Sequence, residues 1–196
     1  MDPLAQHVLD ALYARRSIRV YRPEPVAQEQ LVTLLQAAMA APSACNIQPW
    51  AFIVVTEPEV LARVKAAIPE NGNYNAPAAI VVCGYPELIP WEGDNGLADA
   101  AAAIENILTA ATALGLGTVW IGGFDADRLR EVLDIPPEVV PLGVVYVGHP
   151  AEAKEPRTQY REEAVFWQKY DPTRPVRPRP GCLVWPEGYT PPADQR

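Results

Sequence analysis

The sequence predicts a sandwich in which helices cover a central β-sheet, of either the α/β or the α+β class. Short apolar runs of the strand type alternate along the chain with segments whose apolar residues recur at helical spacing. Proline or glycine stands near most of the junctions, where turns and helix ends are expected. With 196 residues, 49% of them hydrophobic, the chain can bury a substantial core in one domain.

The first half of the chain is predicted to contain three helices and two strands. One-sided apolar stripes indicate the helices, and unbroken apolar runs indicate strands buried in the middle of a sheet. Proline ends the second helical pattern, at Pro42, and proline also opens the third. The helices are expected over residues 3–16, 28–40 and 58–68, and the strands over residues 51–55 and 78–83.

Between the first two helices, residues 17–21 alternate between polar and apolar side chains, as an extended segment does. The alternation predicts that Ser17 and Arg19 point to one side of the chain. Ile18 and Val20 are then expected to point to the other side.

The longest helix is predicted over residues 95–114. Asp94 or Asn95 can cap its start, and Gly115 can close its end. Its many alanines leave the helix apolar on several sides, which predicts either a central helix or a subunit interface. The remaining strands are expected over residues 118–121 and 139–147, and the remaining helices over residues 125–133 and 161–169.

The composition changes near the C-terminus, which divides the chain into a domain over residues 1–170 and an extension over residues 171–196. The extension is rich in proline and has no hydrophobic periodicity, so an extended conformation is predicted. Trp185 and Tyr189 are expected to pack on the body or on a neighbouring subunit. A solvated linker is the alternative.

Composition excludes several classes of function. A net charge of −8 disfavours a nucleic-acid surface, and the apolar runs are too short to span a membrane. The three cysteines lie far apart and are odd in number, which indicates a cytoplasmic location. His7 and His149 have no partner at metal-ligand spacing, so no metal site is expected.

Three stretches could bind a ligand. Residues 15–19 carry three arginines and a serine, which suits a phosphate group as well as a solvated basic face. Residues 41–50 carry amides that can match the edge of a heterocycle, although a plain helix–strand connection can look the same. After a predicted strand, Gly122 and Gly123 allow close approach to the backbone, as they would in an ordinary turn.

Taken together, these stretches resemble the FMN-dependent nitroreductase family in both order and spacing. The resemblance extends from about residue 8 to about residue 170. It rests on three motifs: Arg15-Arg16-Ser17-x-Arg19-x-Tyr21, Pro42-Ser43-x-x-Asn46-x-Gln48-Pro49-Trp50, and Gly115-Leu116-Gly117-x-x-Trp120-Ile121-Gly122-Gly123.

The resemblance implies a homodimeric α+β fold, a three-layer sandwich with a mostly antiparallel sheet, and FMN bound where the two subunits meet. The cofactor-binding residues that it implies on one subunit are Arg15, Arg16, Ser17, Arg19, Asn73, Gly122, Gly123 and Arg157, with Lys154 as the alternative to Arg157. From the other subunit it implies Pro42, Ser43, Ala44, Asn46 and Gln48. The two glycines would bring backbone N–H groups near flavin N5.

The resemblance further implies an NAD(P)H-dependent oxidoreductase. Hydride would pass from NAD(P)H through the flavin to a flat, electron-poor acceptor such as a nitroaromatic or a quinone, in a ping-pong cycle. Other flavin chemistry on the same fold, such as reductive dehalogenation or flavin fragmentation, is one alternative, and a flavin-binding protein with little turnover is another. Two positions depart from the family: Cys45 stands where glycine is frequent, and Gly122 stands where some members carry glutamate.

Overall fold

The computed structural model describes residues 2–89, 95–158 and 160–174. Its centre is a four-stranded sheet in the order β1-β2-β4-β3, and every neighbouring pair is antiparallel. An antiparallel sheet with helices makes the fold α+β, so this part of the prediction is confirmed and the α/β alternative is wrong. The strands are β1 (Trp50–Val55), β2 (Ala78–Gly84), β3 (Gly117–Ile121) and β4 (Val140–Gly148).

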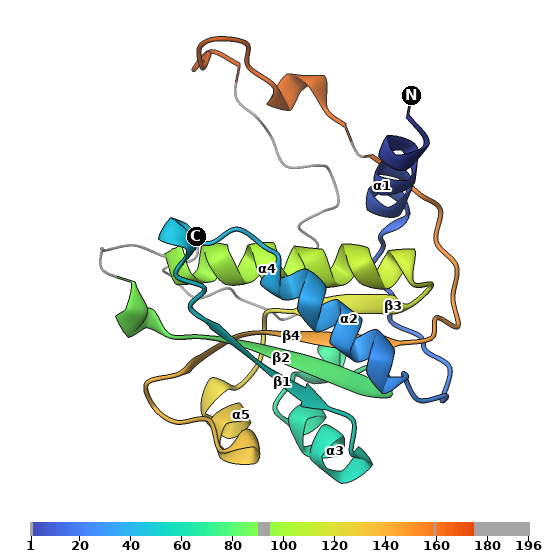
Figure 1. The fold of residues 1–196 in the computed structure, drawn as a ribbon, viewed down its shortest axis with the longest axis vertical. Coiled ribbons are helices and arrows are strands. Elements are labelled where there is room, and N and C mark those ends of the chain that lie inside the picture. Colours follow the sequence, from blue (N-terminus) through green and yellow to red (C-terminus); the bar gives the residue numbers. More distant parts are fainter. Residues whose placement is uncertain (1, 90–94, 159, 175–196) are drawn as a thin grey trace. The chain divides into compact units, whose positions relative to one another are not determined.

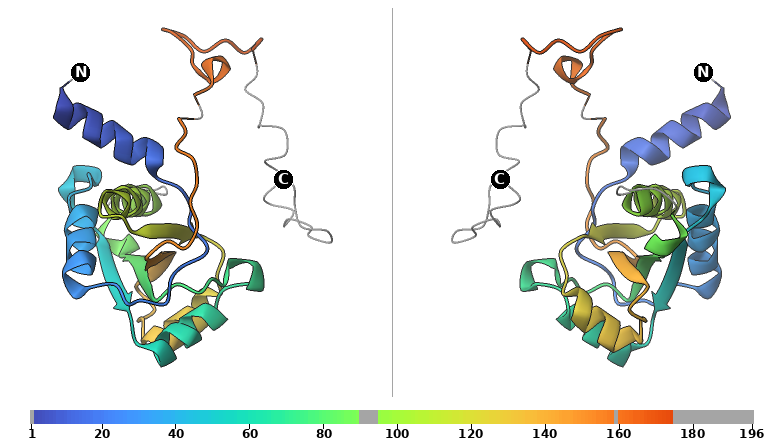
Figure 2. Two further views of the ribbon diagram at one scale, coloured as in Figure 1. Left: turned by 90° about the vertical axis from the view of Figure 1, so that its right-hand side faces the viewer. Right: turned by 90° about the vertical axis from the view of Figure 1, so that its left-hand side faces the viewer.

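Helices cover both faces of the sheet (Figures 1 and 2). One buried cluster joins α2 and α4 to Ile80 and Val145, and the other joins α3 and α5 to Val81 and Tyr146. Adjacent residues of β2 and β4 therefore face opposite layers, as the pleat requires. The helices are α1 (Pro3–Ala14), α2 (Gln28–Met39), α3 (Pro58–Ala66), α4 (Asn95–Ala113) and α5 (Ala126–Leu133), with short 3-10 turns η1 (Ala44–Asn46), η2 (Glu70–Gly72), η3 (Pro86–Leu88) and η4 (Glu162–Ala164).

Local chemistry explains the helix ends. The side chain of Asp125 caps α5 by accepting from the N–H of Arg128 at 3.0 Å. Gly115, at φ +73°, ends α4 in the left-handed conformation that glycine adopts without strain. The predicted caps of α4 at its start, Asp94 and the side chain of Asn95, lie outside the described residues.

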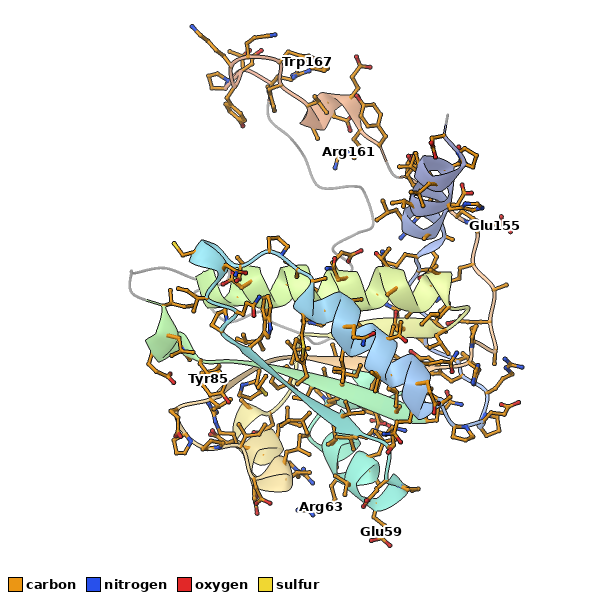
Figure 3. All side chains as sticks on the ribbon, in the orientation of Figure 1. Glu59, Arg63, Tyr85, Glu155, Arg161 and Trp167 are labelled. Atoms are coloured by element: carbon orange, nitrogen blue, oxygen red, sulfur yellow. The ribbon has the colours of Figure 1, made fainter. Side chains whose placement is uncertain are left out.

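The helix α3 buries one of its faces against the sheet. Leu61 and Val64 of α3 are buried against the sheet. Glu59 and Arg63 point away from it (Figure 3). This is the division that the apolar stripe predicts.

One local prediction is wrong. Residues 161–169 contain only the turn η4, because Val165 is extended and Gln168 has a left-handed φ of +63°, which interrupts a helix. In the segment 17–21, Ile18 is buried and Val20 is 49% exposed. Within the described part of the chain the segment forms single bridges at Ser17 and Tyr21, and the predicted alternation of its side chains stays a prediction.

The chain divides into two compact units, and the second begins at Thr158. Within it, the ring centroids of Phe166 and Tyr170 lie 4.5 Å apart, and the Arg174 guanidinium lies 4.3 Å from the Phe166 centroid. The predicted boundary at residue 170 stays a prediction, and the extension from 175 onward, with Trp185 and Tyr189, lies outside the described residues.

The first helix buries none of its residues. Leu4, Val8 and Leu12, which form the predicted stripe, are all exposed. None of the described helices combines the length and hydropathy that a membrane span requires.

Candidate functional site

The extended segment 17–21 lies against the start of β3 and against the chain that follows β4. The N–H of Ile18 donates to the Thr118 carbonyl at 2.8 Å, and Tyr21 bridges to Pro150. The buried hydroxyl of Tyr21 donates to the Ile18 carbonyl at 2.5 Å, and burial raises the pKa of this phenol. The segment is therefore held in place by a small number of long-range contacts.

The close approach of this segment to β3 explains the second glycine of the Gly-Leu-Gly motif. A Cβ at Gly117 would lie 2.8 Å from Cγ2 of Ile18 and 2.9 Å from its Cβ. Any larger residue must displace Ile18, and with it the neighbouring Ser17 and Arg19.

We expect Gly117→Ala to destabilise the ligand-free protein by about 1–3 kcal/mol, the usual cost of overpacking. Urea unfolding measures this change. Gly122→Ala is the matched control, because a Cβ at Gly122 meets no atom within 4 Å. Equal stability of the two variants would contradict the assigned role of Gly117.

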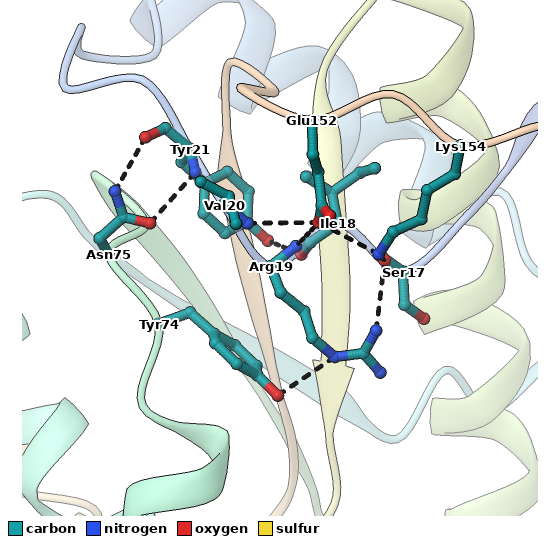
Figure 4. A network of polar contacts seen from close by, with 9 residues as sticks. All are labelled: Ser17, Ile18, Arg19, Val20, Tyr21, Tyr74, Asn75, Glu152 and Lys154. Atoms are coloured by element: carbon teal, nitrogen blue, oxygen red, sulfur yellow. Dashed lines mark hydrogen bonds and ion pairs between the residues drawn. The ribbon is translucent and has the colours of Figure 1, made fainter.

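Cationic side chains gather around the Ser17 carbonyl (Figure 4). Nζ of Lys154 donates to this oxygen at 2.5 Å, and Nη1 of Arg19 approaches it at 3.4 Å. Arg16 donates from its guanidinium to the Glu155 carbonyl, and the N–H of Arg157 donates to the Tyr13 carbonyl. In a chain with net charge −8, this cluster creates a local positive potential that suits one anion.

Glu152 is a residue that sequence reasoning missed. Its Oε1 accepts from the N–H of Arg19 at 2.5 Å and of Val20 at 3.3 Å, and it pairs with Nζ of Lys154 at 3.1 Å (Figure 4). The N–H of Arg19 is the largest cause that lowers the pKa of this carboxyl, and Lys154 adds to it. No sequence motif identifies Glu152 as a carboxylate that lies close to the arginines.

The lowered pKa predicts how Glu152 affects stability. A group whose pKa falls on folding adds stability above its ordinary pKa and loses it as the pH drops through the folded pKa. We therefore expect Glu152→Gln to destabilise most near neutral pH and progressively less below about pH 4. Urea unfolding of both proteins across this range measures the difference, and a constant difference at every pH would contradict the expectation.

The loop at 71–75 reaches the same segment, through two residues other than the predicted Asn73. The hydroxyl of Tyr74 accepts from Nε of Arg19 at 3.1 Å. Asn75 pairs with the backbone of Tyr21 in both directions, at 3.1 and 2.8 Å. Asn73 is exposed, and its N–H donates to the Glu70 carbonyl. The sequence signal that could have pointed to Tyr74 is its position between two asparagines in a polar loop.

The second predicted stretch, residues 42–48, forms a strained loop. Cys45, Asn46 and Gln48 have φ values of +50°, +56° and +56°, in the left-handed region that costs most residues energy. The N–H of Gln48 donates to Oγ of Ser43 at 2.9 Å, and Nε2 of Gln48 donates to Oδ1 of Asn46 at 3.2 Å. Both amides are exposed.

Asp99, near the start of α4, holds this loop. Its Oδ1 accepts from the N–H of Ala44 at 3.1 Å, whereas its buried Oδ2 has no hydrogen-bond partner among the described residues. Ser17, in contrast, pairs with Thr118, just beyond the other end of α4. From Asp99 to its last residue, α4 rises about 21 Å, so the two stretches lie far apart within one chain.

Gly122 and Gly123 follow β3 and are exposed, and a Cβ added at either position would meet no atom within 4 Å. Arg15 pairs with Glu105 of α4, at 3.5 Å between Nε and Oε1. One chain thus brings together Arg16, Ser17 and Arg19 with Lys154.

The sequence profile of the nitroreductase family matches this chain over residues 12–95 and 75–149. The chain belongs to the nitroreductase family. The match includes Arg15 to Arg19, the loop at 42–48 and the two glycines after β3, so the predicted family is confirmed.

Relatives of similar length support the assignment. A protein of Archaeoglobus fulgidus with the provisional name NADH dehydrogenase/NAD(P)H nitroreductase is 43% identical over 155 residues, covering 76% of this chain and 89% of that protein. A Bacillus subtilis protein named FMN reductase, NAD(P)H, is 34% identical over 182 residues, covering 83% of this chain and 73% of that protein. The solved structure of an FMN-dependent nitroreductase from Clostridium difficile R20291 has a TM-score of 0.75 at 29% identity, covering 83% of this chain and 99% of that one.

Proposed function

We propose that this nitroreductase-family protein binds FMN and uses NAD(P)H to reduce flat, electron-poor acceptors such as nitroaromatics or quinones. The observation that carries the proposal is the cluster of Arg16, Arg19 and Lys154 around Ser17 in an otherwise acidic chain. A phosphate ester attached to a flat ring fits such a cluster, since guanidinium and ammonium groups bind phosphate oxygens. In this proposal the protein works in the cytoplasm.

The proposed active unit is a homodimer with two shared sites. Ser17 and the loop at 42–48 lie at opposite ends of α4, so both can contact one flavin only if they come from different chains. The exposed apolar stripe of α1 supports the proposal, because such a stripe gains stability when a second chain covers it.

The residues present fit the cofactor. Arg15, Arg16, Ser17 and Arg157 are proposed to hold the phosphate, with Lys154 as the alternative to Arg157, and Arg19 is proposed to hold the polar edge of the ring near N1. Gly122 and Gly123 leave open space in which a ring can approach backbone N–H groups. From the second chain, Asn46 and Gln48 would supply amide contacts to the ring.

Bound FMN would supply the redox chemistry, taking electrons from NAD(P)H and passing them to the acceptor. The protein's part is to hold the ring, to expose one face and to set the charge around it. A positive charge at Arg19 favours the reduced flavin and so raises its potential. Glycine at position 122 leaves the mouth of the site without a side chain, which admits larger acceptors.

A spectrum of the purified protein, before and after anaerobic NADH or NADPH, tests the proposal. We expect a yellow protein that bleaches on adding one of the two donors and regains its colour when a nitroaromatic or quinone is added. A colourless protein that takes up no added FMN would overturn the proposal. A yellow protein that keeps its colour would favour a flavin-binding role with little turnover.

A further inference from the structure

We propose that Glu152 is a positioning residue of the flavin site, which holds the Ser17–Val20 backbone in place and offsets the charge of Lys154. The inference rests on the proposed function, because it concerns the same cation cluster. Glu152 is not proposed to contact the ligand; it acts through Arg19 and Lys154.

Glu152 holds two adjacent backbone groups at once. A single oxygen of Glu152 receives two successive N–H groups, those of Arg19 and Val20, together with Nζ of Lys154. Hydrogen bonds to an ionised acceptor are about twice as strong as neutral ones. Among the described residues, the carbonyls between the bridges at Ser17 and Tyr21 accept from the Tyr21 hydroxyl, at Ile18, and from the Ala151 N–H, at Val20. Glu152 adds the partner of the two N–H groups of the same stretch, those of Arg19 and Val20.

The backbone contact of Glu152 also bears on the direction of the Arg19 side chain. The N–H of Arg19 donates to Glu152, whereas the Arg19 side chain extends to the Tyr74 hydroxyl and the Ser17 carbonyl (Figure 4). The carboxylate therefore contacts this backbone at the Arg19 N–H, and the guanidinium approaches it at the Ser17 carbonyl. Loss of Glu152 would free the main chain and, with it, the side chain that is proposed to meet the ring.

Glu152 and Lys154 also set the charge near the proposed site. The Glu152–Lys154 pair is about three-quarters buried on both sides, with side-chain exposures of 25% and 24%, so solvent screens it less than an exposed pair. Paired, the two charges largely cancel. Removing the carboxylate leaves the ammonium uncompensated, whereas removing the ammonium leaves the carboxylate, so the two changes act on a nearby flavin with opposite signs.

The test compares Glu152→Ala, Glu152→Gln and Lys154→Met with the control Glu24→Gln, which removes one exposed carboxylate near the same segment. FMN dissociation constants come from fluorescence titration, potentials from redox titration, and folding from urea unfolding of the ligand-free proteins. Glutamine keeps an oxygen that can accept from the two N–H groups. If Glu152→Ala does not fold, Glu152→Gln still tests the charge argument.

We expect Glu152→Ala to weaken FMN binding at least tenfold and Glu152→Gln to weaken it less. We also expect Glu152→Gln to raise the potential of bound FMN and Lys154→Met to lower it. A tenfold change in the preference for reduced over oxidised FMN is about 30 mV for a two-electron couple. Glu24→Gln should change neither quantity.

The outcomes separate the two proposals. Wild-type protein that binds no FMN overturns the proposed function, and this inference with it. If the wild type binds FMN, wild-type affinity in Glu152→Ala overturns this inference alone. Potentials that move in the same direction in Glu152→Gln and Lys154→Met, or that match the control, also overturn it, because a purely structural role gives no opposite signs.

Discussion

Replacing Arg19 with alanine is expected to weaken FMN binding by roughly 10- to 100-fold, and to slow flavin reduction by NAD(P)H. The guanidinium is proposed to donate to the ring near N1, and a hydrogen bond to a charged group contributes about 1.5–3 kcal/mol. The ligand-free fold should change little, since Arg19 is exposed and its backbone contacts do not need the side chain. Fluorescence titration and anaerobic stopped-flow absorbance measure the two effects.

Two further variants sharpen the Arg19 experiment. Arg22→Ala removes an exposed guanidinium three residues away and should bind FMN as the wild type does. Tyr74→Phe removes the hydroxyl that accepts from Nε of Arg19, and should weaken binding less than Arg19→Ala. Unchanged affinity and unchanged bleaching in Arg19→Ala would contradict the role given to this residue.

Mixing Arg19→Ala chains with Asn46→Ala chains is expected to restore one tight FMN site in each mixed dimer. If every site takes Arg19 from one chain and Asn46 from the other, one site of the heterodimer carries both changes and the second carries neither. Differently tagged chains, exchanged in mild denaturant and purified through both tags, give this dimer. FMN titration should then saturate at about one tight site per two chains.

The matched control pairs wild-type chains with chains that carry both substitutions. Shared sites predict no intact site in this second heterodimer, because each of its sites then contains one altered residue. Sites built within a single chain predict the reverse for the two mixtures. That reversed result would contradict the shared site, and with it the argument from the opposite ends of α4.

Much of the fold follows from local pattern. Four strands and five of the six expected helices are present, because apolar periodicity together with proline and glycine marks such elements. The sixth, over residues 161–169, is absent because Val165 is extended and Gln168 has a left-handed φ. Of its apolar residues, Phe166 contacts the Tyr170 ring, whereas Trp167 is 78% exposed. A pattern predicts that apolar residues are covered, but not what covers them.

The candidate site contains residues that the sequence motifs identified and others that no motif identified. The motifs identified Arg19, Asn46 and Gly122, because residue types and spacings within a few positions of the chain are enough to recognise a motif. They also marked Cys45 as a departure from glycine, and its φ of +50° now gives the reason, since glycine reaches that conformation without steric cost. Glu152 and Tyr74 were missed, because their roles exist only when distant segments meet.

By itself, the amino-acid sequence determined the family and, except over residues 161–169, the order of helices and strands; it also predicted the residues that are proposed to meet a flavin phosphate. Only the tertiary structure decided that Glu152 accepts from the N–H of Arg19, which stands 133 residues earlier in the chain. It also decided that α4 separates the two halves of the proposed site. Helix and strand patterns arise from interactions within a few residues and can be read locally. Contacts across such separations depend on how the layers pack, which no spacing along the chain records.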